Sequence, residues 1–499
     1  MNQLSENSYN KGPGQTYYAY AGYPSIKIYK KDTGNAWANH LLFGDFIIIK
    51  SLDIVNGRVK ARSRNKNGWV KADEIQKQRV LEVNFVDIGQ GDGCHIVTPD
   101  DQHIIVDSGE TDNMNRYLTW RFYLYNKKKP LPFPFISLIS HSDVDHYRGF
   151  QYIFDNKNIR FSRLYHNGLV ERPGNEPLGA EEDGYITGLV QTNDEMRTLI
   201  SDENNRKGSR STYCKTLYKA LKANPDIQYK SLARKDGYVE GFEETNRVND
   251  KEFSIKILGP ITEKINGKDA LKSINNLGKD KNGHSVIIKI RYGEADILLG
   301  GDVNTEFGKI LHHYYEQNNI LDELRVDVAK ACHHGSNHFY YQFIEDINSA
   351  ATVISSGDDE SYAHPRPDAI GAFGKCGYGD RPLVFSTELA RSNKEITFIK
   401  LEKVANYFDS IKEKKEKIKE LRNDGYANSS EEVKKLKKQI TDLNKKINSF
   451  ATKFGMINLR TDGKKMIIAQ KYERETASGK WDIHMLEYSE DTKRFELKE

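Results

Sequence analysis

The densest group of side chains able to do chemistry is the run His141-Ser142-Asp143-Val144-Asp145-His146. It follows an apolar segment, and four of its six side chains can bind a metal ion. Histidine and aspartate are costly at a buried strand end unless they are paired or bound to metal. Because one such loop can supply ligands to two ions, the run predicts a metal-dependent site.

Further candidate ligands follow apolar segments later in the chain. Asp302 follows ILLGG, His333 and His334 lie in AKACHHGS, and His364 lies in SYAHPRP. Polar residues at strand ends are where binding sites usually form. Each position is one where a strand would deliver a ligand to the same sheet edge, so the sequence predicts a single site built from all of these segments.

The segments that carry these residues are predicted to be strands of a hydrolase core over residues 80–400. Apolar runs such as LEVNFV, HIIVDS, SVIIKI and ADILLG are bounded by Gly, Asp or Pro, as is typical of strands. Residues 150–254 are polar and are predicted to form an inserted lid, with helices near 195–201 and 212–223. Strand-like sequence in residues 455–499 is expected to complete the core.

The N-terminal part has a different pattern. Residues 1–15 are polar and include Gly12-Pro13-Gly14, which predicts a flexible tail. Residues 16–79 consist of short alternating segments separated by turn residues, which predicts a small antiparallel barrel. The GDF step and Gly68-Trp69-Val70 resemble a bacterial SH3-like domain, in which Trp69 either fills the barrel core or lines a partner-binding groove.

Residues 401–454 are predicted to form an antiparallel helical hairpin inserted before the last strands. Asp424-Gly425 marks the turn, and Ser429 with Glu432 predicts a capping box. The second helix carries a heptad seam of Val433, Leu436, Ile440, Leu443, Ile447 and Phe450. Fourteen Lys and Arg against nine Asp and Glu make the hairpin basic, which suits either a solvated helix face or a docking arm for a partner or nucleic acid.

Five motifs in order, FVDIGQGDG, IIVDSG, HSDVDHYRG, LLGGD and HHGS, followed by AHP, resemble the metallo-β-lactamase fold. The similarity is closest to the branch that contains the hydrolase domain of the ComEC competence proteins of DNA uptake. The resemblance implies an αββα sandwich, in the α/β (α+β) class, with metal ions at the sheet edge. It covers about residues 80–387 and resumes at Gly455.

The resemblance also implies a ligand set for two divalent ions. His141 and Asp143 would bind one ion, Asp145 and His146 the other, and Asp302 would bridge them. One histidine of the pair His333 and His334, with His334 preferred, would complete the first position, and His364 would complete or support the second. Asp143 stands where the commoner motif has histidine, which favours Mn²⁺ while Zn²⁺ stays open.

The chemistry that follows is hydrolysis by a metal-bridging hydroxide. Asp145 would orient the nucleophile, and Asp107 would orient the ligand loop through hydrogen bonds. Ser336, the amides of Gly335 and Ser336, and Arg366 are candidates for neutralising a substrate oxygen. Asp87, Gln90 and Asp92 are expected to support the floor of the site. Asn282 and Ser285 also fit the family pattern.

Composition limits the partners. The 75 Lys and Arg nearly balance the 71 Asp and Glu, giving a net charge of only +4, so nucleic-acid affinity must come from local patches. No apolar run approaches the ~20 residues of a membrane span, no secretory signal is evident, and the four cysteines are scattered, so a cytoplasmic protein is expected. The favoured function is a phosphodiesterase or nuclease acting on nucleic acid or a nucleotide, fitting a prokaryotic defence effector. The alternative is an assembly subunit that cleaves another ester or amide and is gated by a partner at the SH3-like domain or the hairpin.

Overall fold

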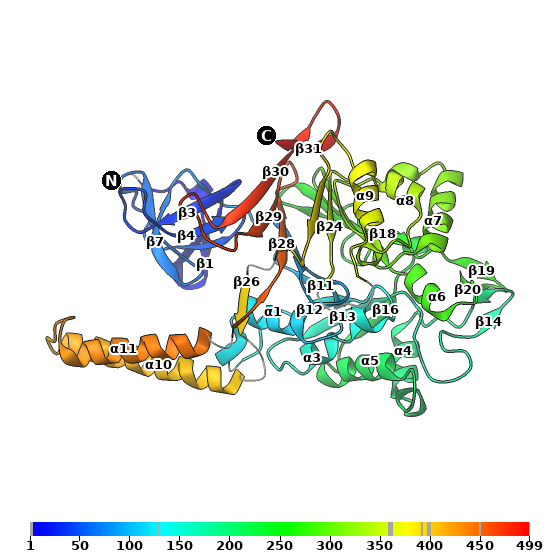
Figure 1. Cartoon of the computed structure of the whole chain (residues 1–499), viewed down its shortest axis with the longest axis horizontal. Helices are drawn as coiled ribbons and strands as arrows, with labels where there is room; N and C mark the ends of the chain where they lie inside the picture. The colour runs from blue at the N-terminus through cyan, green and yellow to red at the C-terminus, as the bar shows by residue number, and fades with distance from the viewer. Residues whose placement is uncertain are drawn as a thin grey trace.

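The computed structural model describes residues 3–127, 129–357, 363–390, 393–396, 401–448 and 451–498. These residues form a small barrel, a body of two facing sheets with helices outside them, and a long helical hairpin (Figure 1). The mixture of several sheets with helices confirms the expected α+β class.

The barrel is an antiparallel sheet in which β2 pairs with β5 and β8, and the order continues through β6, β7, β3 and β4. Its strands are β1 (Asn10–Gly12), β2 (Thr16–Ala21), β3 (Ser25–Tyr29), β4 (Trp37–Leu42), β5 (Phe46–Ile49), β6 (Arg58–Ser63), β7 (Lys66–Lys71) and β8 (Ile75–Gln76). Alternate residues such as Ile26 and Ile28 point into one apolar core, as the period of two requires. Trp69 is half-buried and outside that core, so it does not fill it.

The start of the chain differs from the expected flexible tail. Leu4 and Tyr9 are each only 5% exposed and belong to the barrel core. The Leu4 amide donates to the Leu52 carbonyl at 2.8 Å, and short 3-10 turns at Glu6–Ser8 and Pro13–Gln15 flank β1. These two buried side chains supply the apolar contact that orders an otherwise polar segment.

The larger sheet of the body runs in the order β16-β13-β12-β11-β10-β9-β28-β29-β30-β31. Its strands are β9 (Leu81–Val86), β10 (Gly93–Val97), β11 (His103–Ser108), β12 (Phe135–Leu138), β13 (Phe161–His166), β16 (Gln228–Ser231), β28 (Met456–Thr461), β29 (Lys465–Lys471), β30 (Trp481–Ser489) and β31 (Arg494–Lys498). β11, β12, β13 and β16 are parallel, whereas β9, β10 and β28 to β31 pair antiparallel. The C-terminal strands therefore extend the same sheet that β9 begins.

The second sheet runs in the order β17-β18-β21-β22-β23-β24-β25. Its strands are β17 (Arg247–Val248), β18 (Lys251–Gly259), β21 (Ile287–Tyr292), β22 (Ala295–Leu299), β23 (Val328–Lys330), β24 (Ala351–Ile354) and β25 (Leu383–Ser386). β22 to β25 are parallel. One buried apolar cluster joins the inner faces of both sheets, with Val83 and Ile96 from the larger sheet and Ile288 and Val353 from the second.

Helices cover the outer faces of both sheets, giving an α/β/β/α order of layers (Figure 1). On the larger sheet lie α1 (Asn113–Arg121), α3 (Phe150–Phe154), α4 (Asn193–Ser201) and α5 (Thr212–Ala223). On the second sheet lie α7 (Thr305–Gln317), α8 (Tyr341–Ile347) and α9 (Pro367–Cys376), and α6 (Leu277–Gly283) contacts α7. A small separate sheet contains β14 (Glu181–Glu182), β15 (Tyr185–Ile186), β19 (Glu263–Ile265) and β20 (Lys268–Lys272).

Most of residues 150–254, expected to form an inserted lid, instead build the body. The segment supplies β13 and β16 to the larger sheet, and its helices α4 and α5 pack on that sheet through Met196, Tyr213 and Leu217. The two expected helices are present, and Thr192 and Glu195 close a capping box on α4. Apolar residues spaced along a polar segment thus bury one helix face, which average polarity does not reveal.

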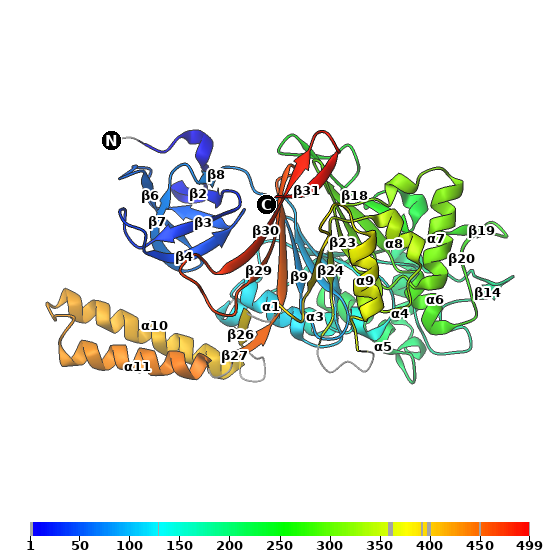
Figure 2. The same ribbon diagram turned by 45° about the horizontal axis from the view of Figure 1, so that its top comes forward.

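The helical hairpin of α10 (Leu401–Asn423) and α11 (Glu431–Asn448) projects from the body between β26 (Asn393–Ile396) and β27 (Ala451–Phe454), which pair antiparallel (Figure 2). Val404, Ile411 and Ile447 are buried along its seam. Ser430, not Ser429, accepts the capping hydrogen bond from the Val433 amide, and Phe450 lies outside the described residues. Among the described residues, no helix is both long enough and apolar enough to cross a membrane.

Candidate metal centre

The candidate site lies where parallel strands of both sheets end. Asp107 is near the end of β11, and the His141 loop follows β12. In the second sheet, Asp302 follows β22 and His334 follows β23. Because parallel strands deliver the residues after their carboxyl ends to one edge of a sheet, segments far apart in sequence meet there.

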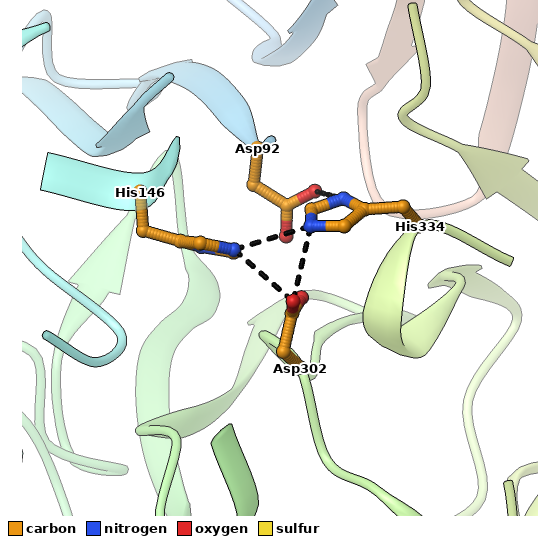
Figure 3. Close-up of side chains that lie close together, drawn as sticks. All are labelled: Asp92, His146, Asp302 and His334. Atoms are coloured by element: carbon orange, nitrogen blue, oxygen red, sulfur yellow. Dashed lines mark hydrogen bonds and ion pairs between the residues drawn. The ribbon is translucent and has the colours of Figure 1, made fainter. Parts of the chain in front are cut away.

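Four buried side chains converge at this edge: Asp92, His146, Asp302 and His334 (Figure 3). One ligand atom from each lies within 4.8 Å of the others. The Nε2 atoms of His146 and His334 lie 3.2 and 3.0 Å from Asp302 Oδ2, and 3.2 Å from each other. Imidazole nitrogens and carboxylate oxygens at this spacing can hold a metal ion.

An oxygen behind each histidine fixes its ring. His146 Nδ1 is hydrogen-bonded to Asp107 Oδ2 at 2.8 Å, whereas His334 Nδ1 is hydrogen-bonded to the Ser355 carbonyl at 3.2 Å and lies 3.1 Å from Asp92 Oδ1. A carboxylate or backbone carbonyl that accepts from Nδ1 orients the other ring nitrogen toward a metal. Both Nε2 atoms are therefore directed at the same carboxylate of Asp302.

Asp107 is placed by an uncommon backbone conformation. Its φ is +55°, which few residues other than glycine, asparagine and aspartate adopt. The carboxylate accepts from the Ser140 amide at 2.8 Å and lies 2.6 Å from the Ser140 hydroxyl, just before the His141 loop. Asp107 thus ties the end of β11 to the ligand loop, and it is not among the described residues that line the pocket onto which the cluster opens.

The electrostatics of the cluster follow from its carboxylates. Burial alone disfavours the charged forms, but Asp302 and Asp107 raise the pKa of His146 well above its ordinary value. Asp302 and Asp92 likewise overcome burial and raise the pKa of His334 to about 10. In turn, His334 and His146 hold the pKa of Asp302 well below its ordinary value despite burial. The carboxylates thus favour positive charge at the centre of the cluster, which a divalent ion would supply.

His141 and Asp143 form a neighbouring pair beside this cluster. His141 Nε2 lies 3.8 Å from Asp143 Oδ2, and the His141 and His146 ring centres are 4.0 Å apart. Burial lowers the pKa of His141 well below its ordinary value, so the ring is neutral. Within the described chain, His141 Nε2 and Asp302 Oδ1 are buried without a hydrogen-bond partner, as expected of atoms that bind a metal.

The structure distinguishes the two adjacent histidines. Both have a positive φ, of 51° for His333 and 53° for His334, so the chain turns between them. His334 is 3% exposed and lies within the cluster, whereas His333 Nε2 is 4.0 Å from Asp302 Oδ2 at the pocket edge. His364 also lines the pocket, with its ring centre 6.3 Å from that of His334.

Asp145 and Ser336 lie beside the cluster, at the pocket onto which it opens. Asp145 Oδ2 is 3.7 Å from His334 Nε2, and the Gln90 amide donates to the same oxygen at 3.3 Å. Ser336 lines the pocket, and its hydroxyl accepts from the His338 amide at 3.2 Å. Both side chains therefore face the space in which a substrate would bind.

The cluster opens onto a pocket with about 310 Å³ of solvent space. Every lining side chain that the structure describes is polar: Gln90, Asp143, Asp145, Asn282, Asp302, His333, His334, Ser336, Asn337, His338, His364 and Arg366. Such a lining suits a hydrophilic substrate better than an apolar one.

A glycine joins the VDIGQGD segment to the ligand loop. Gly91 has a φ of +102°, and a Cβ there would lie 1.7 Å from the Asp145 carbonyl oxygen. No other residue could allow this approach, since a side chain would displace the loop that carries Asp145. Asp92 follows directly, which is how this segment reaches His334.

Sequence reasoning missed three features of the site. Asp92 was expected to be a support of the site floor but belongs to the buried cluster itself. Lys330 makes ion pairs with Asp92 and, at 3.7 Å, with Asp302, and Lys281 pairs with Asp143 at 2.5 Å. The position of Lys330 at the end of β23, three residues before the histidine pair, was the available signal for the first lysine.

Replacing Asp107, which lies behind His146, or Asp92, which lies beside the His334 ring, is expected to weaken metal binding while leaving Asp302 and both imidazoles in place. Asp107→Asn and Asp92→Asn should each lower metal affinity by roughly 10- to 100-fold, because the imidazole loses its oriented, charged acceptor. Titration of metal-free protein with Zn²⁺ or Mn²⁺ measures the effect. Asp100→Asn, at a solvent-facing turn, is the control and should bind like the wild type. Unchanged affinity in both site variants would contradict the orienting role.

Comparison with protein-family models and with curated proteins gave no match. Among solved structures, the chain is similar to NlpC2 from Trichomonas vaginalis at 14% identity and a TM-score of 0.12. The match covers 19% of this chain and 39% of that one, so it spans less than half of NlpC2. A likeness this weak indicates neither a fold nor a function.

Proposed function

We propose that the chain is a metal-dependent hydrolase of the metallo-β-lactamase fold, close to the ComEC-like branch, and that it cleaves phosphodiesters in nucleic acid or a nucleotide. The observation that carries the proposal is the buried cluster of Asp92, His146, Asp302 and His334 at the edge of two facing sheets. The ordered sequence motifs resemble those of this family, and the cluster is built from residues of four of them.

The lining of the pocket supports a phosphodiester as the substrate. Arg366 is exposed at the rim, and Ser336, Asn337 and His338 offer further donors. A phosphodiester carries a charge and several oxygens that such donors recognise. The absence of apolar side chains among the described lining residues disfavours acyl or aromatic substrates.

In the proposed reaction, residues of the chain would hold the metal ions, orient the attacking water and neutralise charge on the substrate. His146, His334 and Asp302 would hold one divalent ion, Zn²⁺ or Mn²⁺, and His141 and Asp143 would contribute to a second. The bound metal supplies Lewis acidity and lowers the pKa of water. Asp145, held by Gln90, orients the attacking water and can accept its proton. Arg366 and Ser336 neutralise charge on the phosphoryl oxygens in the transition state.

Cleavage of nucleic acid tests the proposal. Protein loaded with Mn²⁺ or Zn²⁺ should cleave at least one of single-stranded DNA, double-stranded DNA, RNA or a generic phosphodiester. Chelator should abolish the cleavage, and so should Asp145→Ala. Two bound metals with no cleavage of any of these substrates would point to a different bond or to a partner that activates the site.

The salt dependence of binding affinity should distinguish a nucleic-acid substrate from a nucleotide substrate. If the substrate is nucleic acid, binding should fall steeply between 50 and 200 mM salt, by a factor that grows with the number of phosphate contacts. Fluorescence anisotropy with a labelled oligonucleotide and the metal-free protein measures binding apart from cleavage. A flat dependence together with cleavage of a generic phosphodiester would favour a nucleotide substrate.

A further inference from the structure

Lys281 is a buried lysine beside the metal position of His141 and Asp143, and no step of the proposed reaction uses it. It lies near the end of α6, and its side chain is 11% exposed. Its ammonium group lies 2.5 Å from Asp143 Oδ1 and 3.5 Å from Glu171 Oε2. A buried charge persists only when it is paired, and these two carboxylates pair it.

The other oxygen of Asp143 is also engaged by the chain. The surroundings of the Asn282 amide assign its nitrogen to the side of Asp143, since an oxygen there would face only acceptors; so oriented, it donates to Asp143 Oδ2 at 2.5 Å and to the Gly278 carbonyl at 3.0 Å. Both carboxylate oxygens therefore have a donor from the segment 281–282. A metal ion at this position would have to displace the amide or share the carboxylate with the ammonium group.

The two halves of the site also differ in how closely their ligand atoms gather. Asp92, His146, Asp302 and His334 have ligand atoms within 4.8 Å of one another. Within the described chain, neither His141 nor Asp143 belongs to a group of three such atoms at this spacing. One position is thus compact, and the other consists of a single close pair beside a fixed positive charge.

We propose that Lys281 makes the two metal positions unequal. The cluster around Asp302 binds a divalent cation tightly, and the position of His141 and Asp143 binds one at least about 10-fold more weakly, because the ammonium group already neutralises Asp143 and repels a second cation. This inference rests on the proposed metal-dependent function and concerns the relative metal affinities of the two positions. Glu171, from the loop after β13, holds the ammonium group in place and offsets part of its charge.

Metal titration of the full-length, metal-free protein tests this inference independently of cleavage. Calorimetry with Mn²⁺ or Zn²⁺, and metal content after dialysis, should show one metal ion that binds tightly and a second that binds with an affinity at least about 10-fold lower. Lys281→Met should strengthen the second equivalent by about 10-fold or more and leave the first nearly unchanged. Glu171→Gln should weaken binding of the second metal ion further, since it removes a negative charge that offsets the Lys281 ammonium group.

Two further variants complete the experiment. Lys281→Arg keeps the positive charge and should bind like the wild type. Lys279→Met removes an exposed lysine two residues away that pairs with Glu306, and it should change neither equivalent. Circular dichroism and the affinity of the first equivalent report whether each variant is folded.

The outcomes separate this inference from the proposed function. Two equal equivalents in the wild type, or a Lys281→Met variant whose second equivalent is unchanged or lost, would overturn the role of Lys281. Unequal filling that responds to Lys281→Met, in a protein that cleaves no phosphodiester, would support the inference and reject the proposed reaction.

Discussion

Asp302→Asn should abolish metal binding at the cluster and lower the rate of phosphodiester cleavage by at least about 1,000-fold. Both His146 Nε2 and His334 Nε2 approach the Asp302 carboxylate, at 3.2 and 3.0 Å, more closely than they approach Asp145, at 4.0 and 3.7 Å. Asparagine preserves the shape but offers a neutral oxygen, and it leaves the two imidazoles facing each other at 3.2 Å without a negative charge between them. Metal content after gel filtration and the cleavage rate measure the two effects.

A matched substitution and a backbone hydrogen bond that the variant retains support the interpretation of this result. Asp322→Asn removes the same charge from an 85% exposed side chain and should leave metal content and rate unchanged. The backbone N–H of residue 302 donates to Ser285 Oγ at 2.9 Å, and the substitution leaves this donor in place, so the loop should keep its conformation. An Asp302→Asn protein that binds metal with wild-type affinity would show that the cluster is not the metal centre.

Glu82→Gln should lower the free energy of unfolding by about 3–5 kcal/mol at pH 7, the usual cost of breaking a buried ion pair. Glu82 lies on β9 and is 3% exposed. Its carboxylate lies 2.5 Å from Arg121, 2.6 Å from Arg460 and 3.4 Å from Arg79. Glutamine would leave these guanidinium groups buried without their shared negative partner. Urea unfolding followed by fluorescence measures the difference.

The effect of Glu82 should depend on pH with a defined sign. Burial opposes its ionisation, but Arg121, Arg460 and Arg79 lower the pKa of Glu82 well below its ordinary value of about 4.5. Because the pKa is lower in the folded than in the unfolded chain, the stabilisation is fully present above pH 4.5 and is lost as the pH falls through the folded pKa. The difference between the wild type and Glu82→Gln should therefore be largest near pH 7 and shrink below pH 4.5.

An exposed pair provides the control for Glu82. Glu74 pairs with Lys71 at 2.5 Å with both side chains about one-third exposed or more, so Glu74→Gln should cost less than about 1 kcal/mol. Equal destabilisation by the two variants would mean that the guanidinium groups around Glu82 find solvent or other partners when it is neutral.

The sequence determined the chemical inventory of the site and the broad class of the fold. Short-range patterns suffice for this, because strands and amphipathic helices have fixed periods and a run such as His141 to His146 is dense in ligands whatever surrounds it. The two helices within residues 150–254 and the turn of the hairpin at Gly425 were predicted for the same reason. The polar character of residues 150–254 and of residues 1–15 led to two wrong predictions, a lid and a flexible tail. A few buried side chains, such as Leu4 and Tyr213, decide whether a polar segment packs.

Only the tertiary structure decided which ligands meet. The choice of His334 over His333 depends on two successive residues with positive φ, and no periodicity predicts that turn. The pairing of Asp92 with His334 depends on an approach of β9–β10 to the end of β23 across a separation of more than 200 residues. The same holds for Lys281, whose neighbours Asp143 and Glu171 come from two other segments. Such contacts depend on how the two sheets pack face to face. The free energy of that packing comes from the shared apolar core, and the identities of the core residues do not indicate which polar groups the packing brings together.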